Sequence, residues 1–307
     1  MSESHAGRAF VDRFYKVPAA GDENYIQILN DLSVAAGVDA VIPASEPEIF
    51  ALSGLNPAGP PILPSKIPVI AQNGDFVKIH GDKLECFRNL ARHVDVAPFA
   101  DGADPRQLND FIVRYGFPLV IKERRSSGSR RVSVIENRSA LDQQIAQFQA
   151  PVVQAYVDDK EGEFSVGVFS SPEFIQAVAF RRSLGPGGNS WYAELSDDED
   201  VLAYALNIAK SIKISGSVNI QVRKGAMGVK LLEINPRFSS LAAARAACGF
   251  KDVEWSLMLA LGCLSVREPQ PVRLGRFCRF QGELMDFGEG FSAVKEWEPY
   301  FKIGACC

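Results

Sequence analysis

The sequence predicts a mixed protein of the α/β and α+β classes. Amphipathic helical segments and short apolar strand-like segments alternate along most of the 307 residues, which is typical of helices packed on sheets. Residues 215–223 and 228–236 are two strand-like segments separated only by KGAM, which indicates an antiparallel hairpin. The hydrophobic content of 47% is enough to bury the core of two domains, or of one domain with an appended lobe.

The first predicted elements form a small N-terminal lobe. Residues 23–36 have helical periodicity, and the apolar segment 38–43 is typical of a strand in an α/β sheet. Residues 54–68 are dense in proline and interrupt this pattern. We therefore expect an N-terminal lobe over residues 1–80 and a larger domain over residues 81–307.

The larger domain is predicted to begin with two capped helices. Asp82 starts the first helix, and Asp104, which is followed by proline, starts a second helix that ends at Gly116. Residues 117–137 then predict a strand, a polar turn and a second strand, and a short helix begins at Ser139.

The second half of this domain is predicted to be rich in strands. Ser196 and Glu199 have the spacing of a capping box and predict the start of a helix. A glycine-containing loop is expected at 181–192. The strands expected before that loop span residues 151–157, 163–169 and 173–180.

Composition favours a small-molecule partner. The net charge is −4 and no dense run of lysine and arginine occurs, so a nucleic-acid partner is not expected. No stretch approaches the roughly 20 apolar residues of a membrane span, and residues 1–10 lack the apolar segment of a secretion signal, so we expect a cytoplasmic protein without a membrane partner.

The cysteines predict neither disulfides nor a zinc site. None of the six lies in a C-x-x-C pair, so reduced thiols are expected. Cys306 and Cys307 are adjacent at the end of the sequence, where a frayed tail is favoured over a lipidation signal, and their role stays open.

Two common nucleotide-binding motifs are excluded. The sequence has no G-x-x-x-x-G-K-[ST], and residues 185–190 lack both the G-x-G-x-x-G spacing and a following helix. Lys122 remains, at the end of an apolar strand and just before the turn RRSSGSRRV, whose hydroxyl and amide groups could wrap phosphates. A single lysine at the end of a strand is more often a surface residue.

The segment LLEINPRFSS, residues 231–240, ends an apolar strand in polar side chains. Alternation along a strand places Glu233 and Asn235 on one face, with Arg237 beyond Pro236. Gln221 alternates with apolar neighbours on the preceding strand and can share that face. Taken alone, this group would be interpreted as a solvated strand end.

Together these segments resemble the ATP-grasp superfamily, especially carboxylate–amine ligases built like one half of the large subunit of carbamoyl phosphate synthetase. The resemblance rests on VDAVIPASEPEIFAL, GDKLECFRNLARHVDVAP, FPLVIKERRSSGSRRV, VVQAYVDDKEGEFSV, SVNIQV and, most specifically, LLEINPRFSS. It implies an ATP-grasp fold with a shortened N-terminal α/β (pre-ATP-grasp) lobe and a nucleotide lid over about residues 113–156. It also implies ATP as a ligand together with Mg²⁺, for which Mn²⁺ could substitute.

The resemblance assigns roles to individual residues. Lys122 would bind phosphate in a catalytic role, Glu163 would accept hydrogen bonds from the ribose, and Arg237 would neutralise the transferred phosphoryl group. Oxygen ligands are those that Mg²⁺ prefers. The implied phosphate loop contains Ser127, Gly128 and Ser129, and the implied adenine border contains Gln154, Tyr156 and Val157. The implied metal ligands are Gln221, Glu233 and Asn235. Gln221 would also contact the nucleotide.

The phosphate loop departs from the family pattern. Glu123 stands where proline is common, and Ser126 and Arg131 stand where glycine is common. We therefore expect a stiffer and more basic loop than usual.

The resemblance implies an ATP-dependent ligase that activates a carboxylate as an acyl phosphate and joins it to an amine. An ATP-grasp kinase or carboxylase, and a non-catalytic nucleotide-binding module, are the alternatives. The expected partners are a small-molecule carboxylate and an amine, amino acids among them, although the 181–192 loop could equally be a solvated basic loop. The candidate substrate contacts are Arg181, Gly188, Asn189, Arg237 and Ser239.

The N-terminal lobe is predicted to be short. The segment SHAGRAFVDRFYKVP resembles the part of the family that follows the first strand and helix, so the lobe would lack both. A parallel sheet without its first strand has an open edge. We expect either a homodimer that covers this edge or a natural reading frame that starts upstream of Met1.

Overall fold

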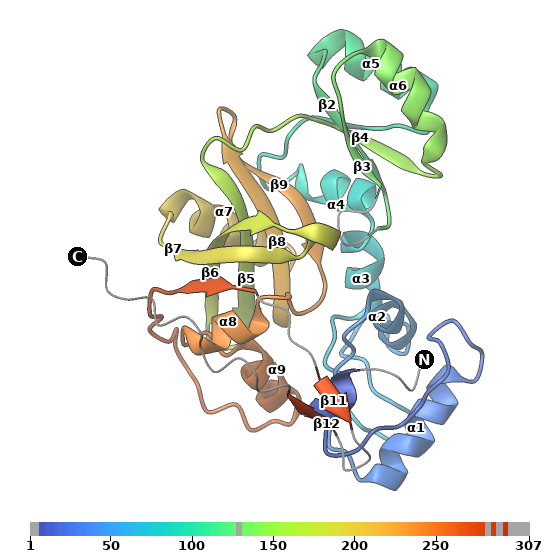
Figure 1. Cartoon of the computed structure of the whole chain (residues 1–307), viewed down its shortest axis with the longest axis vertical. Coiled ribbons are helices and arrows are strands. Elements are labelled where there is room, and N and C mark those ends of the chain that lie inside the picture. The colour runs from blue at the N-terminus through green and yellow to red at the C-terminus, as the bar shows by residue number, and fades with distance from the viewer. Residues whose placement is uncertain (1–5, 127–130, 280–283, 287–290, 294–307) are drawn as a thin grey trace.

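The computed structural model describes residues 6–126, 131–279, 284–286 and 291–293. Three regions follow one another in Figure 1, with N-terminal helices at the bottom, a large sheet in the middle and a small sheet with two helices at the top. Within the described residues no helix is both long and apolar enough to cross a membrane. The described cysteines Cys86, Cys248, Cys263 and Cys278 are free thiols.

Four helices form most of the N-terminal region, preceded by a 3-10 turn, η1 (Ala6–Phe10). Ser45 caps α2, with its side chain accepting from the Glu48 amide and the Glu48 carboxylate accepting from the Ser45 amide. Asp82 caps α4, as predicted. The helices are α1 (Tyr25–Ala36), α2 (Glu46–Ser53), α3 (Gly74–His80) and α4 (Lys83–Leu90).

The prediction of a strand at residues 38–43 is wrong. Val41 makes one isolated parallel bridge to Val69, through hydrogen bonds to the Pro68 carbonyl and from the Ile70 amide. The opposing segment 54–68 is dense in proline, which cannot donate a backbone hydrogen bond, so pairing does not extend into a ladder.

The upper region is a four-stranded antiparallel sheet in the order β1-β4-β2-β3. Its helices α5 (Pro105–Tyr115) and α6 (Arg138–Gln144) pack on it through buried Leu108, Phe111 and Leu141. Asp104 caps α5 as predicted, whereas α6 is capped by Asn137 rather than beginning at Ser139. The strands are β1 (Phe99–Asp101), β2 (Leu119–Glu123), β3 (Val132–Ile135) and β4 (Pro151–Ala155), and η2 (Ile145–Gln147) follows α6.

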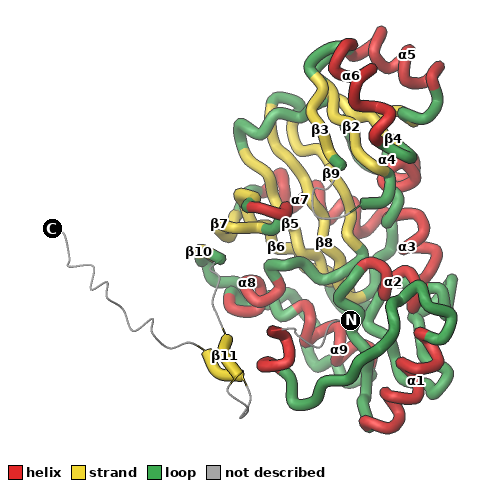
Figure 2. Tube along the Cα trace, turned by 45° about the vertical axis from the view of Figure 1, so that its right-hand side comes forward, coloured by secondary structure: helices red, strands yellow, loops and turns green. Residues whose placement is uncertain are grey.

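The central region is a six-stranded antiparallel sheet in the order β10-β7-β6-β5-β8-β9. Side chains from α4 and α7 (Glu199–Ser211) pack on one face, and α8 (Ala242–Ala247) and α9 (Asp252–Ala260) pack on the other. Figure 2 shows the small sheet above this larger one. The strands of this sheet are β5 (Gly162–Ser170), β6 (Ile175–Leu184), β7 (Ser190–Ser196), β8 (Gly216–Gly225), β9 (Gly228–Asn235) and β10 (Arg276–Cys278). A 3-10 turn, η3 (Pro186–Gly188), connects β6 and β7. Two further strands, β11 (Leu284–Asp286) and β12 (Phe291–Ala293), pair with each other outside this sheet.

Two boundaries in this region differ from the prediction. The loop expected at 181–192 is shorter, because Arg181 pairs with Glu194 and β6 continues to Leu184. The cap of α7 is Asp198, whose side chain accepts from the Val201 amide, and not Ser196. Asp198 lies directly before the helix, so its carboxylate reaches the free amides of the first turn.

The predicted β8–β9 hairpin is confirmed, and its register decides where polar side chains meet. Gly225 lies opposite Gly228, so only Ala226 and Met227 connect the strands. Gln221 lies opposite Glu233, and Asn219 lies opposite Asn235. Directly opposed residues of an antiparallel pair share a face, so Gln221 and Glu233 project together.

A buried ionic network ties β8 to the two helices beneath the sheet. Arg245 of α8 is fully buried and donates to Asp252 at 3.1 Å and to Asn219. Asp252 also accepts from Ser217 at 2.7 Å. The guanidinium runs directly beneath Gly167, where an added Cβ would lie 2.4 Å from Arg245 Cζ.

The packing predicts that Gly167→Ala destabilises the fold. The new methyl group must displace a buried guanidinium that already holds Asp252 and Asn219, so we expect a loss of about 1–3 kcal/mol in the free energy of unfolding. Denaturant titration measures this. Gly21→Ala is the control, because nothing lies within 4 Å of its new methyl group. Equal stability of the two variants would contradict the packing argument.

Candidate functional site

A cavity of about 290 Å³ lies between the small and central sheets. Its apolar part is lined by Val120, Val132, Val134, Ala155, Val157, Leu184 and Leu232. Its polar part is lined by Lys83, Lys122, Ser126, Gln154, Glu163, Arg182, Gln221, Arg223 and Glu233. An aliphatic slot that opens onto charged groups suits a ligand with a flat apolar ring at one end and an anion at the other.

Lys122 is held in this cavity by β2. Its ammonium group donates to Gln154 Oε1 at 2.7 Å and to the Leu232 carbonyl at 3.3 Å. Gln154 in turn donates to the Leu231 carbonyl at 3.2 Å. Burial and the nearby Lys83 ammonium lower the pKa of Lys122 to about 7. The Lys122 charge therefore depends on pH near neutrality.

Lys83 is a second lysine in the cavity, and the sequence interpretation missed it. Its side chain is almost fully buried, and Nζ lies 3.3 Å from Glu233 Oε2 and 2.8 Å from the Ser126 carbonyl. Lys83 is the first residue of α4, where the helix dipole disfavours a cation. A lysine directly after the Asp82 cap was thus the signal in the sequence that could have indicated a functional role.

Glu163 anchors the opposite side of the cavity. It accepts from Arg182 at 2.8 Å and from Arg223 at 2.7 Å. Burial opposes its ionisation, but the two guanidinium groups outweigh burial and hold the pKa of Glu163 below its usual range. Arg182 also donates to Gln221 Oε1 at 2.7 Å, which links this ion-pair cluster to the predicted metal ligands.

The three predicted metal ligands lie together on β8 and β9. Gln221 opposes Glu233, and the Asn235 amide donates to Glu233 Oε1 at 3.1 Å. Burial raises the pKa of Glu233, but Lys83, the Asn235 hydrogen bond and Lys122 outweigh it, and the pKa lies below its usual range. The predicted donor set is one carboxylate and two amides. Among the described residues, no group of three or more histidine, cysteine, aspartate or glutamate side chains is arranged to hold a metal ion.

This donor set fits a divalent cation. Magnesium is bound in proteins through one or two carboxylates, with the remaining positions filled by neutral oxygens, water or substrate phosphate. Positive groups already face two of the donors, since Lys83 faces Glu233 and Arg182 faces Gln221. The carboxylate is ionised, and a bound cation would have to displace Lys83 and Arg182 from these oxygens or share the oxygens with them.

The remaining predicted residues lie in several places. Val157 lines the cavity, whereas Tyr156, Gly188, Asn189 and Ser239 do not. Ser239 is buried beside Ser165, with the two hydroxyl oxygens 3.5 Å apart. The predicted phosphate-loop residues Ser127, Gly128 and Ser129 lie outside the described residues. Arg237 lines a separate cavity near the N-terminal helices.

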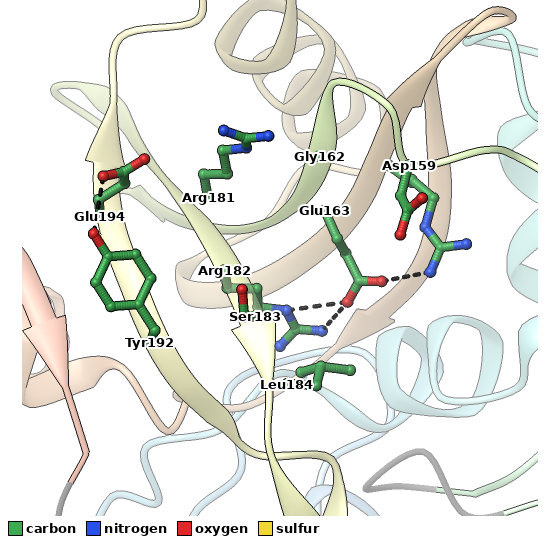
Figure 3. A pocket seen from close by; sticks show the side chains of 10 residues that line it. Asp159, Gly162, Glu163, Arg181, Arg182, Ser183, Leu184, Tyr192 and Glu194 are labelled. Atoms are coloured by element: carbon green, nitrogen blue, oxygen red, sulfur yellow. Dashed lines mark hydrogen bonds and ion pairs between the residues drawn. The ribbon is translucent and has the colours of Figure 1, made fainter.

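Arg181 lies in a hollow of about 550 Å³ on the far side of Glu163. Figure 3 shows Arg181 and Arg182 projecting in different directions, with Tyr192 and Glu194 on the neighbouring strand. The Arg181 side chain passes closely over Gly162, where a Cβ would lie 2.5 Å from Nε. Gly162 also has a φ of 123°, so this position requires glycine for two reasons.

The chain is similar in sequence to known ATP-grasp proteins. Residues 147–277 match a family described as ATP-grasp in the biosynthetic pathway with Ter operon. A biotin carboxylase from Haemophilus influenzae is 26% identical over 152 residues, which cover 46% of this chain and 32% of that protein. The match thus spans about a third of the length of this curated relative.

Solved structures share the fold at low sequence identity. N5-carboxyaminoimidazole synthetase from Staphylococcus aureus, complexed with ADP, aligns with a TM-score of 0.68 and 15% identity over 91% of this chain and 74% of that one. The biotin carboxylase domain of 2-oxoglutarate carboxylase from Hydrogenobacter thermophilus aligns with a TM-score of 0.66 and 14% identity over 88% of this chain and 62% of that one. The predicted fold is confirmed by these alignments.

The geometry predicts that Lys122 titrates near pH 7 and that Lys83 lowers its pKa. Removing the neighbouring charge in Lys83→Met should raise the pKa of Lys122, so its amine should react with an acylating reagent only at higher pH. Peptide mapping of the labelled residue across pH 5–10 measures the midpoint. Lys213→Met is the control, because Lys213 lines a different cavity. A Lys122 midpoint that is the same with and without Lys83 would contradict the coupling.

Proposed function

We propose that this chain, which has the ATP-grasp fold, binds ATP with Mg²⁺ in the 290 Å³ cavity and joins a carboxylate to an amine. One observation carries the proposal: two buried lysines, the ionised Glu233 and the Gln221 amide meet at one end of an aliphatic slot. Phosphoryl transfer needs mainly positioning and charge neutralisation, and these side chains provide both.

The reaction follows from this arrangement. A carboxylate oxygen attacks the γ-phosphorus of ATP, the bond to the β-phosphate oxygen breaks, and an acyl phosphate and ADP form. The amine nitrogen then attacks the carbonyl carbon, phosphate leaves with the carbon–oxygen electron pair, and the nitrogen loses a proton. Activation is required because the oxygen of a free carboxylate is a poor leaving group.

The side chains of the cavity have separate tasks in this proposal. The aliphatic slot holds the adenine ring, and Glu163 is placed to accept hydrogen bonds from the ribose once a hydroxyl competes with its guanidinium partners. Lys83 and Lys122 neutralise the phosphates. Gln221, Glu233 and Asn235 would hold Mg²⁺ or Mn²⁺, which would neutralise charge on the phosphates during transfer.

A carboxylase is the second candidate, because both a curated relative and several structural neighbours carry carboxylase or carboxyaminoimidazole synthetase names. A kinase acting on a small molecule and a non-catalytic nucleotide-binding module are the further alternatives. Hydroxylamine separates these possibilities, since it traps an acyl phosphate of an added carboxylate as a hydroxamate. ADP release with bicarbonate alone would favour the carboxylase.

The proposed partners are small molecules, with amino acids as the first acids and amines to test. The biotin carboxylase domain from Hydrogenobacter thermophilus is described as a dimer. We also propose that the chain forms a homodimer and is located in the cytoplasm. Sedimentation of the full chain tests the first of these.

Glu233→Gln should abolish turnover without unfolding the chain. Loss of the one carboxylate removes charge stabilisation of several kcal/mol, so we expect ADP release to fall about 100-fold or more. Mn²⁺ binding, followed by electron paramagnetic resonance, should weaken in parallel and gives a readout that does not depend on turnover. Glu173→Gln is the matched control, because Glu173 is exposed and pairs with Arg267. Near-normal turnover and Mn²⁺ binding in Glu233→Gln would refute the assignment.

Lys122→Met should weaken ATP binding and slow turnover together. Its charge meets phosphate in both the ground state and the transition state, so we expect roughly a tenfold loss in affinity and a further loss in kcat. Lys210→Met, on the exposed end of α7, controls for the loss of a positive charge. ATP affinity should also fall as pH rises above 7 in the unchanged chain, because Lys122 loses its proton there. A flat affinity between pH 6 and 9 would argue against the Lys122 role.

A further inference from the structure

A cavity of about 520 Å³ lies between the N-terminal region and the central sheet, and nothing in the proposed nucleotide site uses it. One wall comes from residues 43–73 of the N-terminal region. The other comes from residues 213–217 before and within β8, residues 236–238 after β9, and the end of α9. Figure 1 shows these elements next to one another at the lower end of the large sheet. The cavity is large enough for a small organic molecule.

Most of the cavity wall is apolar. Prolines are frequent in it, and they contribute surface without a backbone donor. Among the side chains that line it there is no aspartate and no glutamate. The apolar members are Pro43, Ile49, Ala58, Pro60, Pro61, Pro68, Val69, Ile70, Ala71, Pro172, Pro236, Phe238, Leu259 and Ala260.

Several polar groups of the wall are already bonded within the protein. The Gln72 amide donates to the Ser215 carbonyl at 2.5 Å. Ser217 donates to Asp252 at 2.7 Å, and Ser256 donates to the Asp252 carbonyl at 2.7 Å. These groups support the wall and have little capacity left for a ligand.

Two cations differ from the other polar groups. Lys213 is exposed and has no hydrogen-bond or ion-pair partner in the part of the chain that the structure describes. Arg237 donates through Nη1 to the Phe238 carbonyl at 3.2 Å, and its Nε forms an ion pair with Glu46 Oε1 at 3.6 Å. No described residue accepts a hydrogen bond from Arg237 Nη2, so this side of the guanidinium is available to a ligand.

Arg237 also connects this cavity to the metal ligands. It follows Asn235 by two residues, a reach of roughly 7 Å along extended backbone. A ligand carboxylate bound by Arg237 would therefore lie near the end of β9 that carries Glu233 and Asn235.

We propose that this cavity binds a small carboxylic acid with an apolar body, its carboxylate on Arg237 and its body against the proline-rich wall. Lys213 adds to the positive potential that attracts the acid. The binding itself needs only this cavity, whereas the role of the acid as phosphoryl acceptor rests on the proposed function. A polyanionic acid, or an acid with a polar side chain, does not suit a wall of this composition.

The test uses straight-chain carboxylates from butanoate to decanoate as probes on the full chain, with calorimetry and no ATP. Each methylene that enters the apolar wall should tighten binding roughly fourfold until the cavity is full. The uncharged octanamide should bind at least about tenfold more weakly than octanoate, because it cannot form a charge-assisted pair with Arg237.

Matched variants locate the probe. Arg237→Gln should weaken octanoate about tenfold and leave octanamide unchanged, and Ala260→Trp at the exposed end of α9 should exclude both by filling the cavity. Arg181→Gln, in the separate 550 Å³ hollow, should leave octanoate affinity unchanged. The proposal is overturned if no probe binds, if octanamide equals octanoate, if Arg237→Gln has no effect, or if Ala260→Trp still binds octanoate normally.

A separate measurement distinguishes this inference from the proposed function. ATP binding is followed on the same samples with a fluorescent ATP analogue. Octanoate binding without any ATP binding would support the cavity assignment and refute the ligase. ATP binding without acid binding would overturn the cavity assignment and leave the nucleotide site in place.

Discussion

The candidate site depends on the antiparallel register of β8 and β9. The two-residue turn between Gly225 and Gly228 fixes the register as far as Val222 and Leu231. A register shift between Gln221 and Val222 then leaves Leu232 unpaired and places Gln221 directly across from Glu233. A slip by one residue would turn Glu233 into the apolar core and bring Ile234 to the cavity. The polar end of the 290 Å³ cavity therefore depends on the short turn together with this bulge, beside which both Leu232 and Glu233 line the cavity.

The balance of charged side chains determines which ligands the 290 Å³ cavity can bind. Lys83 and Lys122 face the single carboxylate Glu233, while Arg182 and Arg223 face the single carboxylate Glu163. Each acidic side chain is thus ionised, and the cavity as a whole has an excess of positive charge. Such an excess in a partly buried space is costly without a ligand and favourable with a polyphosphate.

A buried ionic network holds α8 and α9 against the central sheet. Arg245 is fully buried, and it joins α8, α9 and β8 through Asp252 and Asn219. Gly167 lacks a side chain at the point where this guanidinium passes under β5. The network keeps the floor of both cavities together, because β8 carries Gln221 toward one cavity and Ser217 toward the other.

The sequence by itself determined the features that depend on local periodicity. The alternation of apolar residues in 215–223 and 228–236 predicted the hairpin and indicated that Gln221 can share a face with Glu233. The bulge that sets the two residues directly opposite each other was not predicted. The strand before Lys122 and the caps at Asp82 and Asp104 were also predictable, because each depends on a few neighbouring residues. The resemblance of these motifs to the ATP-grasp superfamily predicted the fold that the comparisons confirm.

The tertiary structure decided what depends on segments far apart in the chain. Lys83 meets Glu233 only because α4 packs against the sheet, and Arg237 lines the second cavity only because the N-terminal region closes over the end of β9. The strand expected at 38–43 failed because its partner segment is rich in proline, which no pattern within 38–43 reveals. Periodicity reports which face a residue occupies, whereas the neighbour on that face is set by packing between elements.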